Sequence, residues 1–376
     1  MPTKSMRWLL LCLSLAATLL GSLNFVRAPD TTLAWKLALV GGEFGHWMVA
    51  VPLIVAGLAA AFVQSGWRVV ILAFCALAIA GLLRPAIEAW RLGRTAPGLR
   101  FSWSRLYWPG KTRLLPVQTE VYARPGGVEL QLDFYSPPFR KDTTERPPCL
   151  VVIHGGGWDS GDNKQLADWN HRWAARGWAV ATLNYRLAPK FPWPAQREDV
   201  MAALAWLKAN ARRLEFDPHR LVLLGRSAGG QIATAVAYGA RDPDIRGVIA
   251  LYAPHDLRFT WEISREDDAL NSPQLLRQYL GGPPDTPERQ ALYDSGSGQL
   301  LARADSPPTL LIHGHADTLV WYRHGPRLSA RLQELGVPCT HLELPWATHA
   351  FDFNPDGPGG QLADAAIGEF LARVGP

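Results

Sequence analysis

The first part of the chain contains three long uncharged, apolar runs. Residues 8–26 are nineteen consecutive residues without a charge and are rich in Leu and Ala. A second uncharged run covers residues 47–63, and a third begins after Trp67 and Arg68 and ends at Leu83. A helix needs roughly 20 mainly apolar residues to cross a bilayer core, and the ends of a shorter run can be extended by interfacial aromatic and basic side chains. The pattern therefore predicts a membrane region at residues 1–83 with about three transmembrane helices, at 8–26, 47–63 and 67–83.

Two other interpretations of these runs are weaker. Lys4 and Arg7 precede the first run, as in a signal peptide, but nineteen residues exceed the usual apolar core of about 7 to 15, and no clean small-x-small cleavage site follows. The second and third runs could form a buried hairpin of a soluble protein. Polar residues do not alternate within either run, however, which favours lipid-facing helices.

After a linker at residues 84–113, which is basic and aromatic, the pattern changes to short strands. Apolar residues alternate on either side of Pro125-Gly126-Gly127, which predicts a hairpin with a loop wider than two residues. Uniformly apolar strands then alternate with helical stretches such as 195–211 and 229–240. This order predicts a mostly parallel sheet covered by helices on both faces, in a domain at residues 114–376. The expected apolar strands are 150–153, 179–183, 221–224, 248–252 and 310–312, and a further strand is expected at 340–344.

The charges divide in the same way as the hydrophobic pattern. The chain carries 38 Lys and Arg against 33 Asp and Glu, but residues 1–113 hold twelve basic and three acidic residues, a net charge of +9, and the rest has a net charge of −4. Overall basicity therefore does not indicate a nucleic-acid partner. With three spans, six basic residues fall on the side of the C-terminal part and three on the other. The positive-inside tendency then predicts a multi-pass membrane protein whose C-terminal domain is cytoplasmic.

Four cysteines in 376 residues are too few for a disulfide scaffold. Cys149 and Cys339 open strands that we expect to be well separated in the sheet. No disulfide is predicted.

Two glycine-containing motifs follow buried strands, at the carboxyl ends where parallel sheets bind ligands. The first is His154-Gly155-Gly156-Gly157-Trp158, and the second is Gly225-Arg226-Ser227-Ala228-Gly229-Gly230. The second pattern is typical of a serine on a sharp strand-to-helix turn, where Gly225 and Gly229 avoid collisions and the helix N-terminus favours a developing negative charge. Backbone N–H groups of Gly156, Gly157 and Ala228 are the expected oxyanion hole. His154, Gly155 and Trp158 are expected to support this loop.

A nucleophilic serine needs a base and an orienting acid. Asp317 lies in the loop after the strand at 310–312, and His349 lies in the loop after 340–344, so both follow Ser227 in the order acid and then histidine. His255 and Asp256 form the rival pair, but they come early for the acid position. His313 and His315 are expected to shape the Asp317 loop rather than to bind a metal, because no ligand cluster accompanies them. No metal or cofactor is predicted.

These residues resemble the α/β-hydrolase superfamily, and within it the hormone-sensitive-lipase-like carboxylesterases. Besides the two glycine motifs, the stretches Asn184–Pro189, Trp193–Ala195 with Glu198-Asp199, and Asp217-Pro218 carry the resemblance. It implies an α/β-hydrolase fold with an eight-stranded sheet and hydrolysis of small-molecule or lipid esters through Ser227, His349 and Asp317. Arg226 stands where the family often has an acidic residue. The long N-terminal cap of the family is missing as such, and residues 257–304 are a candidate lid.

Other functions stay open on the sequence. The same machinery could cleave an amide, an aryl-formamide or a peptide, and a hydrolase fold without activity could serve as a membrane-bound binding protein. The membrane helices could be an anchor or could help to admit lipid substrates, with Phe101–Trp108 as an interfacial segment. The sequence does not indicate an oligomeric state.

Overall fold

A computed structural model describes residues 4–64, 66–138 and 145–375. The chain forms two compact units. The first contains the chain up to Gly110 together with Gly314–Leu319 and Glu343–Ala366, and the second contains Lys111–His313, Val320–Leu342 and the residues from Ile367. The predicted outer bounds at residues 1 and 376 lie outside the described residues.

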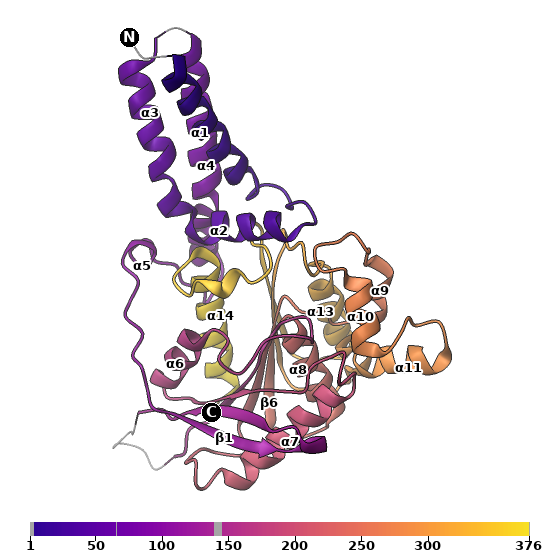
Figure 1. The fold of residues 1–376 in the computed structure, drawn as a ribbon. Helices are drawn as coiled ribbons and strands as arrows, with labels where there is room; N and C mark the ends of the chain where they lie inside the picture. The colour runs from indigo at the N-terminus through magenta and orange to yellow at the C-terminus, as the bar shows by residue number, and fades with distance from the viewer. Residues whose placement is uncertain (1–3, 65, 139–144, 376) are drawn as a thin grey trace. The chain divides into compact units, whose positions relative to one another are not determined.

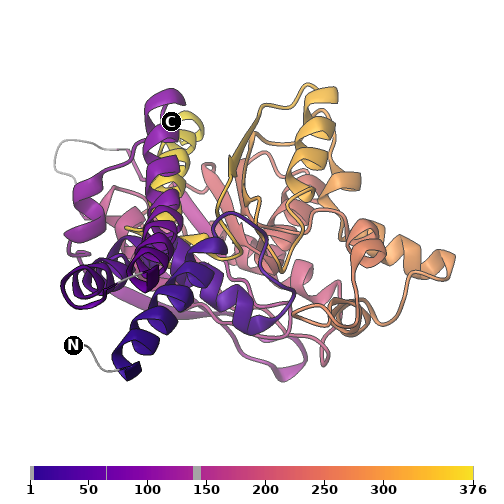
Figure 2. The ribbon, with the colours of Figure 1, turned by 90° about the horizontal axis from the view of Figure 1, so that it is seen from above.

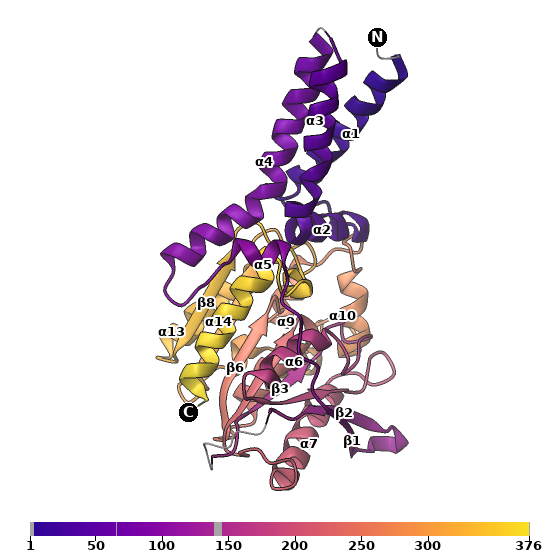
Figure 3. The same cartoon turned by 90° about the vertical axis from the view of Figure 1, so that its left-hand side faces the viewer.

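The N-terminal helices of the first unit are packed side by side. Figures 1 and 3 show α1, α3 and α4 running alongside one another, and Figure 2 shows the same helices from above. Small residues let the backbones approach closely, since a Cβ on Gly81 would lie only 2.6 Å from the carbonyl oxygen of Gly21. The helices are α1 (Lys4–Ser22), α2 (Thr32–Met48), α3 (Ala50–Phe62), α4 (Gly66–Thr95) and α5 (Trp103–Tyr107). The buried side chains between α1, α3 and α4 include Leu10, Val55, Ala59, Val63, Ile71 and Cys75.

Two of these helices, α1 and α4, are long and apolar enough to cross a membrane, judged by length and composition. The predicted second span falls on α3, which has 13 residues and would reach only about 20 Å. It meets the same criterion only together with α2, from which it is bent by 55°. The break lies at Val49, and Pro52 follows in the first turn of α3, where a residue without an N–H group is tolerated.

Helix α4 continues beyond the predicted end of the third span at residue 83. It runs for 30 residues to Thr95 and contains Pro85 in its interior. Proline removes a helical hydrogen bond and crowds the preceding turn, which bends a helix. Figure 3 shows α4 changing direction in its lower part.

The second unit is built on an eight-stranded, mostly parallel sheet with the order β1-β2-β4-β3-β5-β6-β7-β8. The first two strands form the predicted antiparallel hairpin, and the pairs β3–β4, β3–β5, β5–β6 and β6–β7 are parallel. Three strands separate Cys149 in β3 from Cys339 in β8, as expected. The strands are β1 (Val117–Ala123), β2 (Leu130–Tyr135), β3 (Cys149–Ile153), β4 (Ala179–Leu183), β5 (Leu221–Arg226), β6 (Ile245–Leu251), β7 (Thr309–Gly314) and β8 (Cys339–Leu344).

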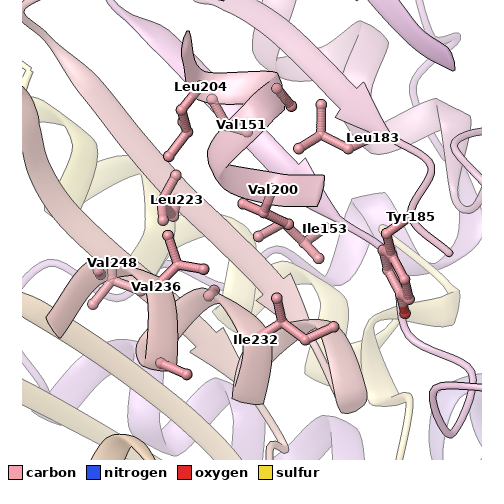
Figure 4. Packing of buried hydrophobic residues seen from close by; sticks show 14 of the residues in the cluster. Val151, Ile153, Leu183, Tyr185, Val200, Leu204, Leu223, Ile232, Val236 and Val248 are labelled. Atoms are coloured by element: carbon pink, nitrogen blue, oxygen red, sulfur yellow. The ribbon is translucent and has the colours of Figure 1, made fainter. Parts of the chain in front are cut away.

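Apolar side chains from neighbouring strands align into one core face. Val151 pairs with Leu223, and Leu223 pairs with Val248, so the three side chains form a row across β3, β5 and β6. Figure 4 shows side chains of α7 and α8 against this row, among them Val200 and Ile232. Each such buried side chain contributes about 1.5 to 3 kcal/mol relative to exposure. This packing makes the strand ends rigid supports for the loops that follow.

The remaining helices follow the strands. Residues 257–304, the candidate lid, fold into four short helices, α9–α12. The helices are α6 (Ala167–Ala175), α7 (Ala195–Asn210), α8 (Ala228–Gly239), α9 (Leu257–Ile263), α10 (Ser272–Leu280), α11 (Pro287–Ser295), α12 (Gly298–Leu301), α13 (His324–Glu334) and α14 (Pro358–Val374), with 3₁₀ turns η1 (Pro125–Gly127) and η2 (Phe351–Phe353).

Candidate active site

Ser227 occupies the turn between β5 and α8. Its φ angle of 52° lies in the left-handed region, which residues other than glycine rarely adopt. The N–H of Ser227 donates to the carbonyl oxygen of Leu251 at 2.9 Å, and the Ser227 carbonyl accepts from the N–H groups of Gly230 and Gln231. The strained turn is therefore held from both sides, as is typical of a serine presented for chemistry.

Glycine is required on both sides of this serine. A Cβ on Gly225 would overlap the carbonyl oxygen of Gly229, and a Cβ on Gly229 would overlap the carbonyl oxygen of Ile153. A Cβ on Gly155 would lie 3.3 Å from Cβ of Ser227, so the glycine loop after β3 passes directly beside the serine. The two glycine motifs are thus neighbours in the second unit.

The glycine loop leaves backbone donors available. The N–H of Gly155 is used by Gln165, whose Oε1 lies 2.9 Å away. Within the described part of the chain, no hydrogen bond is found from the N–H of Gly156 or Gly157. Their φ angles of 121° and 59° favour glycine, and the carbonyl of Gly156 accepts from both the N–H and the hydroxyl of Ser160, which closes the loop into a turn. These two N–H groups are suitable for an oxyanion hole.

His154 contacts the start of the glycine loop. Its ring stacks on Tyr185 with centroids 4.1 Å apart, and the Tyr185 hydroxyl donates to the His154 carbonyl at 3.0 Å. Nδ1 of His154 lies 2.7 Å from the carbonyl oxygen of Gly155, which assigns the proton to Nδ1. Burial lowers the pKa of His154 to about 4, so the ring is neutral near pH 7.

Trp158 joins the other end of the loop to the candidate lid. Its Nε1–H donates to Oε1 of Gln231 at 2.8 Å, and the hydroxyl of Tyr279 donates to the same oxygen at 3.0 Å. The rings of Trp158 and Tyr279 stack with centroids 4.4 Å apart. Helix α10 of the candidate lid thus packs against the glycine loop.

Asp317 and His349 form a hydrogen-bonded pair in the first unit. Nδ1 of His349 lies 2.7 Å from Oδ2 of Asp317, and both residues are buried. The other oxygen, Oδ1, accepts from the N–H of Leu319 at 2.8 Å. With Nδ1–H directed at the carboxylate, Nε2 of His349 is the nitrogen that can act as a base.

Backbone hydrogen bonds bring the loops of this pair together. The N–H of His315 donates to the carbonyl of Leu344, and the N–H of Ala316 donates to that of Ala347, both at 3.0 Å. A Cβ on Gly314 would overlap the carbonyl oxygen of Ala347. These contacts hold the acid loop beside the histidine loop. A side-chain contact adds to them, since Nε2 of His315 lies 2.5 Å from Oε2 of Glu343, 28 positions later in the chain.

The rival pair has a different environment. Oδ1 of Asp256 caps α9 by accepting from the N–H of Phe259, and Oδ2 binds Arg327 at 2.9 Å. Both carboxylate oxygens of Asp256 are thus bonded to groups other than a histidine. Burial lowers the pKa of His255 to about 3.

His313 and Arg226, which the sequence also singled out, contact other residues of the chain. Nε2 of His313 lies 3.1 Å from the carbonyl oxygen of Val320. Over the described residues, no group of three His, Cys, Asp or Glu side chains could hold a metal ion. Arg226 is buried, and its guanidinium lies 5.9 Å from the ring of Trp169.

A family model described as BD-FAE matches residues 132–332, more than half of the chain. The chain belongs to the BD-FAE family. The family match begins in β2, includes the glycine loop, Ser227 and Asp317, and ends before His349. The resemblance to hormone-sensitive-lipase-like esterases is confirmed by the relatives below.

Two curated relatives come from Mycobacterium tuberculosis. The chain is 28% identical over 288 residues to the probable carboxylic ester hydrolase LipM, covering 71% of this chain and 64% of LipM. It is 27% identical over 281 residues to the esterase LipQ, covering 71% of this chain and 65% of LipQ. The chain thus spans just under two thirds of the length of these relatives.

A solved structure of a bacterial heroin esterase has a TM-score of 0.60 with this chain. The identity is 24%, over 69% of this chain and 84% of that one. Together with the eight-stranded sheet, this similarity confirms the α/β-hydrolase fold.

Several residues that shape these loops belong to no sequence motif. Gln165 and Gln231 contact the glycine loop through side-chain amides that no motif marks. In the first unit, the indole Nε1–H of Trp35 donates to the carbonyl of His349 at 3.1 Å. The sequence does mark Glu43, on the same helix as Trp35, because it is the sole acidic residue between positions 31 and 87.

Proposed function

We propose that this chain is a membrane-anchored serine carboxylesterase that hydrolyses carboxylic esters through an acyl-enzyme intermediate. The observation that carries the proposal is the strained turn at Ser227, held beside a glycine loop with N–H groups available for an oxyanion. The hydrogen-bonded Asp317–His349 pair, the family and the names of the relatives support it.

The proposed reaction has two steps. His349 accepts the proton of the Ser227 hydroxyl as its oxygen attacks the ester carbonyl, and the tetrahedral oxyanion is stabilised by the N–H groups of Gly156, Gly157 and Ala228. The protonated His349 then donates to the leaving alcohol, and an acyl-enzyme forms on Ser227. Water, activated by His349, attacks the acyl carbon and releases the acid. Asp317 holds the imidazole in the required tautomer and stabilises its charged form.

The membrane part of the proposal assigns spans to 8–26, 47–63 and 67–83 within a region at residues 1–83, a linker at 84–113 and a hydrolase domain at 114–376 in the cytoplasm. Helices α1 and α4 support two spans by length and composition, and the third proposed span, at 47–63, falls on α3. The excess of basic residues on the side of the C-terminal part supports the orientation. A C-terminal reporter read on both sides of the membrane tests it.

The test of the chemistry is a comparison of the wild-type chain with Ser227→Ala. The wild type should hydrolyse short p-nitrophenyl esters and react with a fluorophosphonate probe, and the variant should do neither. Hydrolysis of anilides but not of the matched esters would favour the amide alternative. A wild-type chain that neither reacts with the probe nor cleaves either bond would favour a binding protein.

A further inference from the structure

Helix α2 contacts the segment that carries His349. The indole Nε1–H of Trp35, in the first turn of α2, donates to the backbone carbonyl of His349 at 3.1 Å. Trp35 therefore binds the backbone of His349, the residue whose side chain is bonded to Asp317.

A second contact lies further along α2. The carboxylate of Glu43 accepts from the N–H of Gly359, at 3.2 Å for Oε1 and 3.1 Å for Oε2. Gly359 is the second residue of α14, so the carboxyl group of Glu43 accepts from a helix N-terminus, where N–H groups lack partners within the helix. A Cβ on Gly359 would lie 2.7 Å from Oε1 of Glu43, and a Cβ on Gly357 would overlap Oε2. The glycines after the histidine loop thus leave room for this carboxylate.

The two contacts hold both ends of one segment. Trp35 and Glu43 are eight residues apart, which places them about 12 Å apart along a helix axis. They bind the first and last residues of the segment from His349 to Gly359, and between them Nδ2 of Asn354 donates to the carbonyl of Glu43 at 3.3 Å. The segment is therefore fastened along α2 rather than at one point.

The burial of Glu43 shows that the contact is more than incidental packing. The residue is 1% exposed. A buried polar group costs free energy unless it is hydrogen-bonded, and this carboxyl group is bonded to the N–H of Gly359.

We propose that α2 is a positioning element of the candidate active site, in which Trp35 and Glu43 hold the loop that sets the place of the His349 imidazole. The inference rests on the proposed function. Both residues act through the backbone, Trp35 at the carbonyl of His349 itself and Glu43 at Gly359, ten positions later. Helix α2 is on this view a structural support of the histidine loop.

The experiment uses the full chain in detergent micelles with p-nitrophenyl butyrate as substrate. Trp35→Phe removes the N–H donor and keeps an aromatic ring, and Trp90→Phe, at a residue 37% exposed, is the matched control. Loss of one neutral hydrogen bond should lower kcat about three- to tenfold with KM within about twofold of wild type. The control should match wild type.

Glu43 supplies a graded series. Glu43→Gln keeps an acceptor for the Gly359 N–H, and Glu43→Ala removes it, so kcat should fall in the order wild type, Gln, Ala. Hydrogen exchange of the peptide at residues 345–360 should become faster in the same order and in Trp35→Phe. If Glu43→Ala does not fold, Trp35→Phe and Glu43→Gln still decide the question.

The outcomes separate this inference from the proposed function. A wild-type chain without esterase activity overturns the proposed function, and with it the positioning role. An active wild type with unchanged kcat and unchanged exchange at 345–360 in Trp35→Phe overturns the positioning role alone. A raised KM with unchanged kcat also overturns it, because that result would place Trp35 in substrate binding.

Discussion

Nδ1 of His349 lies 2.7 Å from Oδ2 of Asp317, in a pair whose members are 6% and 0% exposed. The two residues come from loops after different strands, and backbone hydrogen bonds between these loops hold them in register. The second oxygen of Asp317 is bonded to the N–H of Leu319. The carboxylate is thus held at both oxygens, which fixes its direction toward Nδ1 of His349.

Asp317→Asn should lower kcat for p-nitrophenyl esters on the order of 10³- to 10⁴-fold, because an amide that donates to Nδ1 favours the wrong tautomer. The unfolding midpoint should change little, since the side chain keeps its shape and its bond from Leu319 can be retained. Steady-state kinetics and fluorophosphonate labelling measure the effect. A variant with more than a tenth of the wild-type kcat would show that His349 does not depend on this carboxylate.

The serine turn leads to a stability prediction. Gly229→Ala places a Cβ on the carbonyl oxygen of Ile153, so the strand and helix must separate, and the free energy of unfolding should fall by about 3 kcal/mol or more. Gly239→Ala is the matched control on the same helix, because its nearest neighbour is a Leu301 methyl at 4.0 Å. Alanine there should be neutral or stabilise by up to about 1 kcal/mol. Denaturant unfolding of both variants tests the difference, and equal free energies would contradict it.

The fold of the second unit followed from its sequence because its signals are local. Buried parallel strands are continuous apolar runs, and the turn at Ser227 needs glycines at fixed offsets, so β3, β5 and their motifs could be found by inspection. The contacts of the first unit are different. Glu43 meets Gly359 across 316 positions, and no periodicity carries such a pairing. The sequence does not indicate the break at Val49, because an apolar run has the same composition whether it forms one helix or parts of two.

The buried histidine of the glycine loop predicts a pH dependence of stability. His154 has a pKa of about 4 in the folded chain and an ordinary pKa of about 6.5 when unfolded. Between these values the unfolded chain binds the additional proton, so stability is lost as the pH falls from 6.5 toward 4, by up to about 1.4 kcal/mol per pH unit from this residue. His154→Gln keeps a donor for the Gly155 carbonyl and should make the decline shallower. Urea unfolding at pH 7, 6 and 5 tests this, and equal slopes for wild type and variant would contradict it.

Helix α10 leads to a specificity prediction through Leu275. A Cβ on Gly157 would lie 3.4 Å from Cδ1 of Leu275, so this half-buried side chain borders an N–H group of the proposed oxyanion hole. Leu275→Ala removes three carbons at that border and should admit longer acyl chains, because each buried methylene contributes about 0.8 kcal/mol, or roughly fourfold in kcat/KM. The ratio of kcat/KM for p-nitrophenyl octanoate to that for the acetate should therefore rise at least about fourfold. Leu270→Ala, at a residue 39% exposed in the same segment, should leave the ratio unchanged. If both variants keep the wild-type ratio, the acyl chain does not pass Leu275, and α10 would act on the glycine loop through Tyr279 and Trp158 alone.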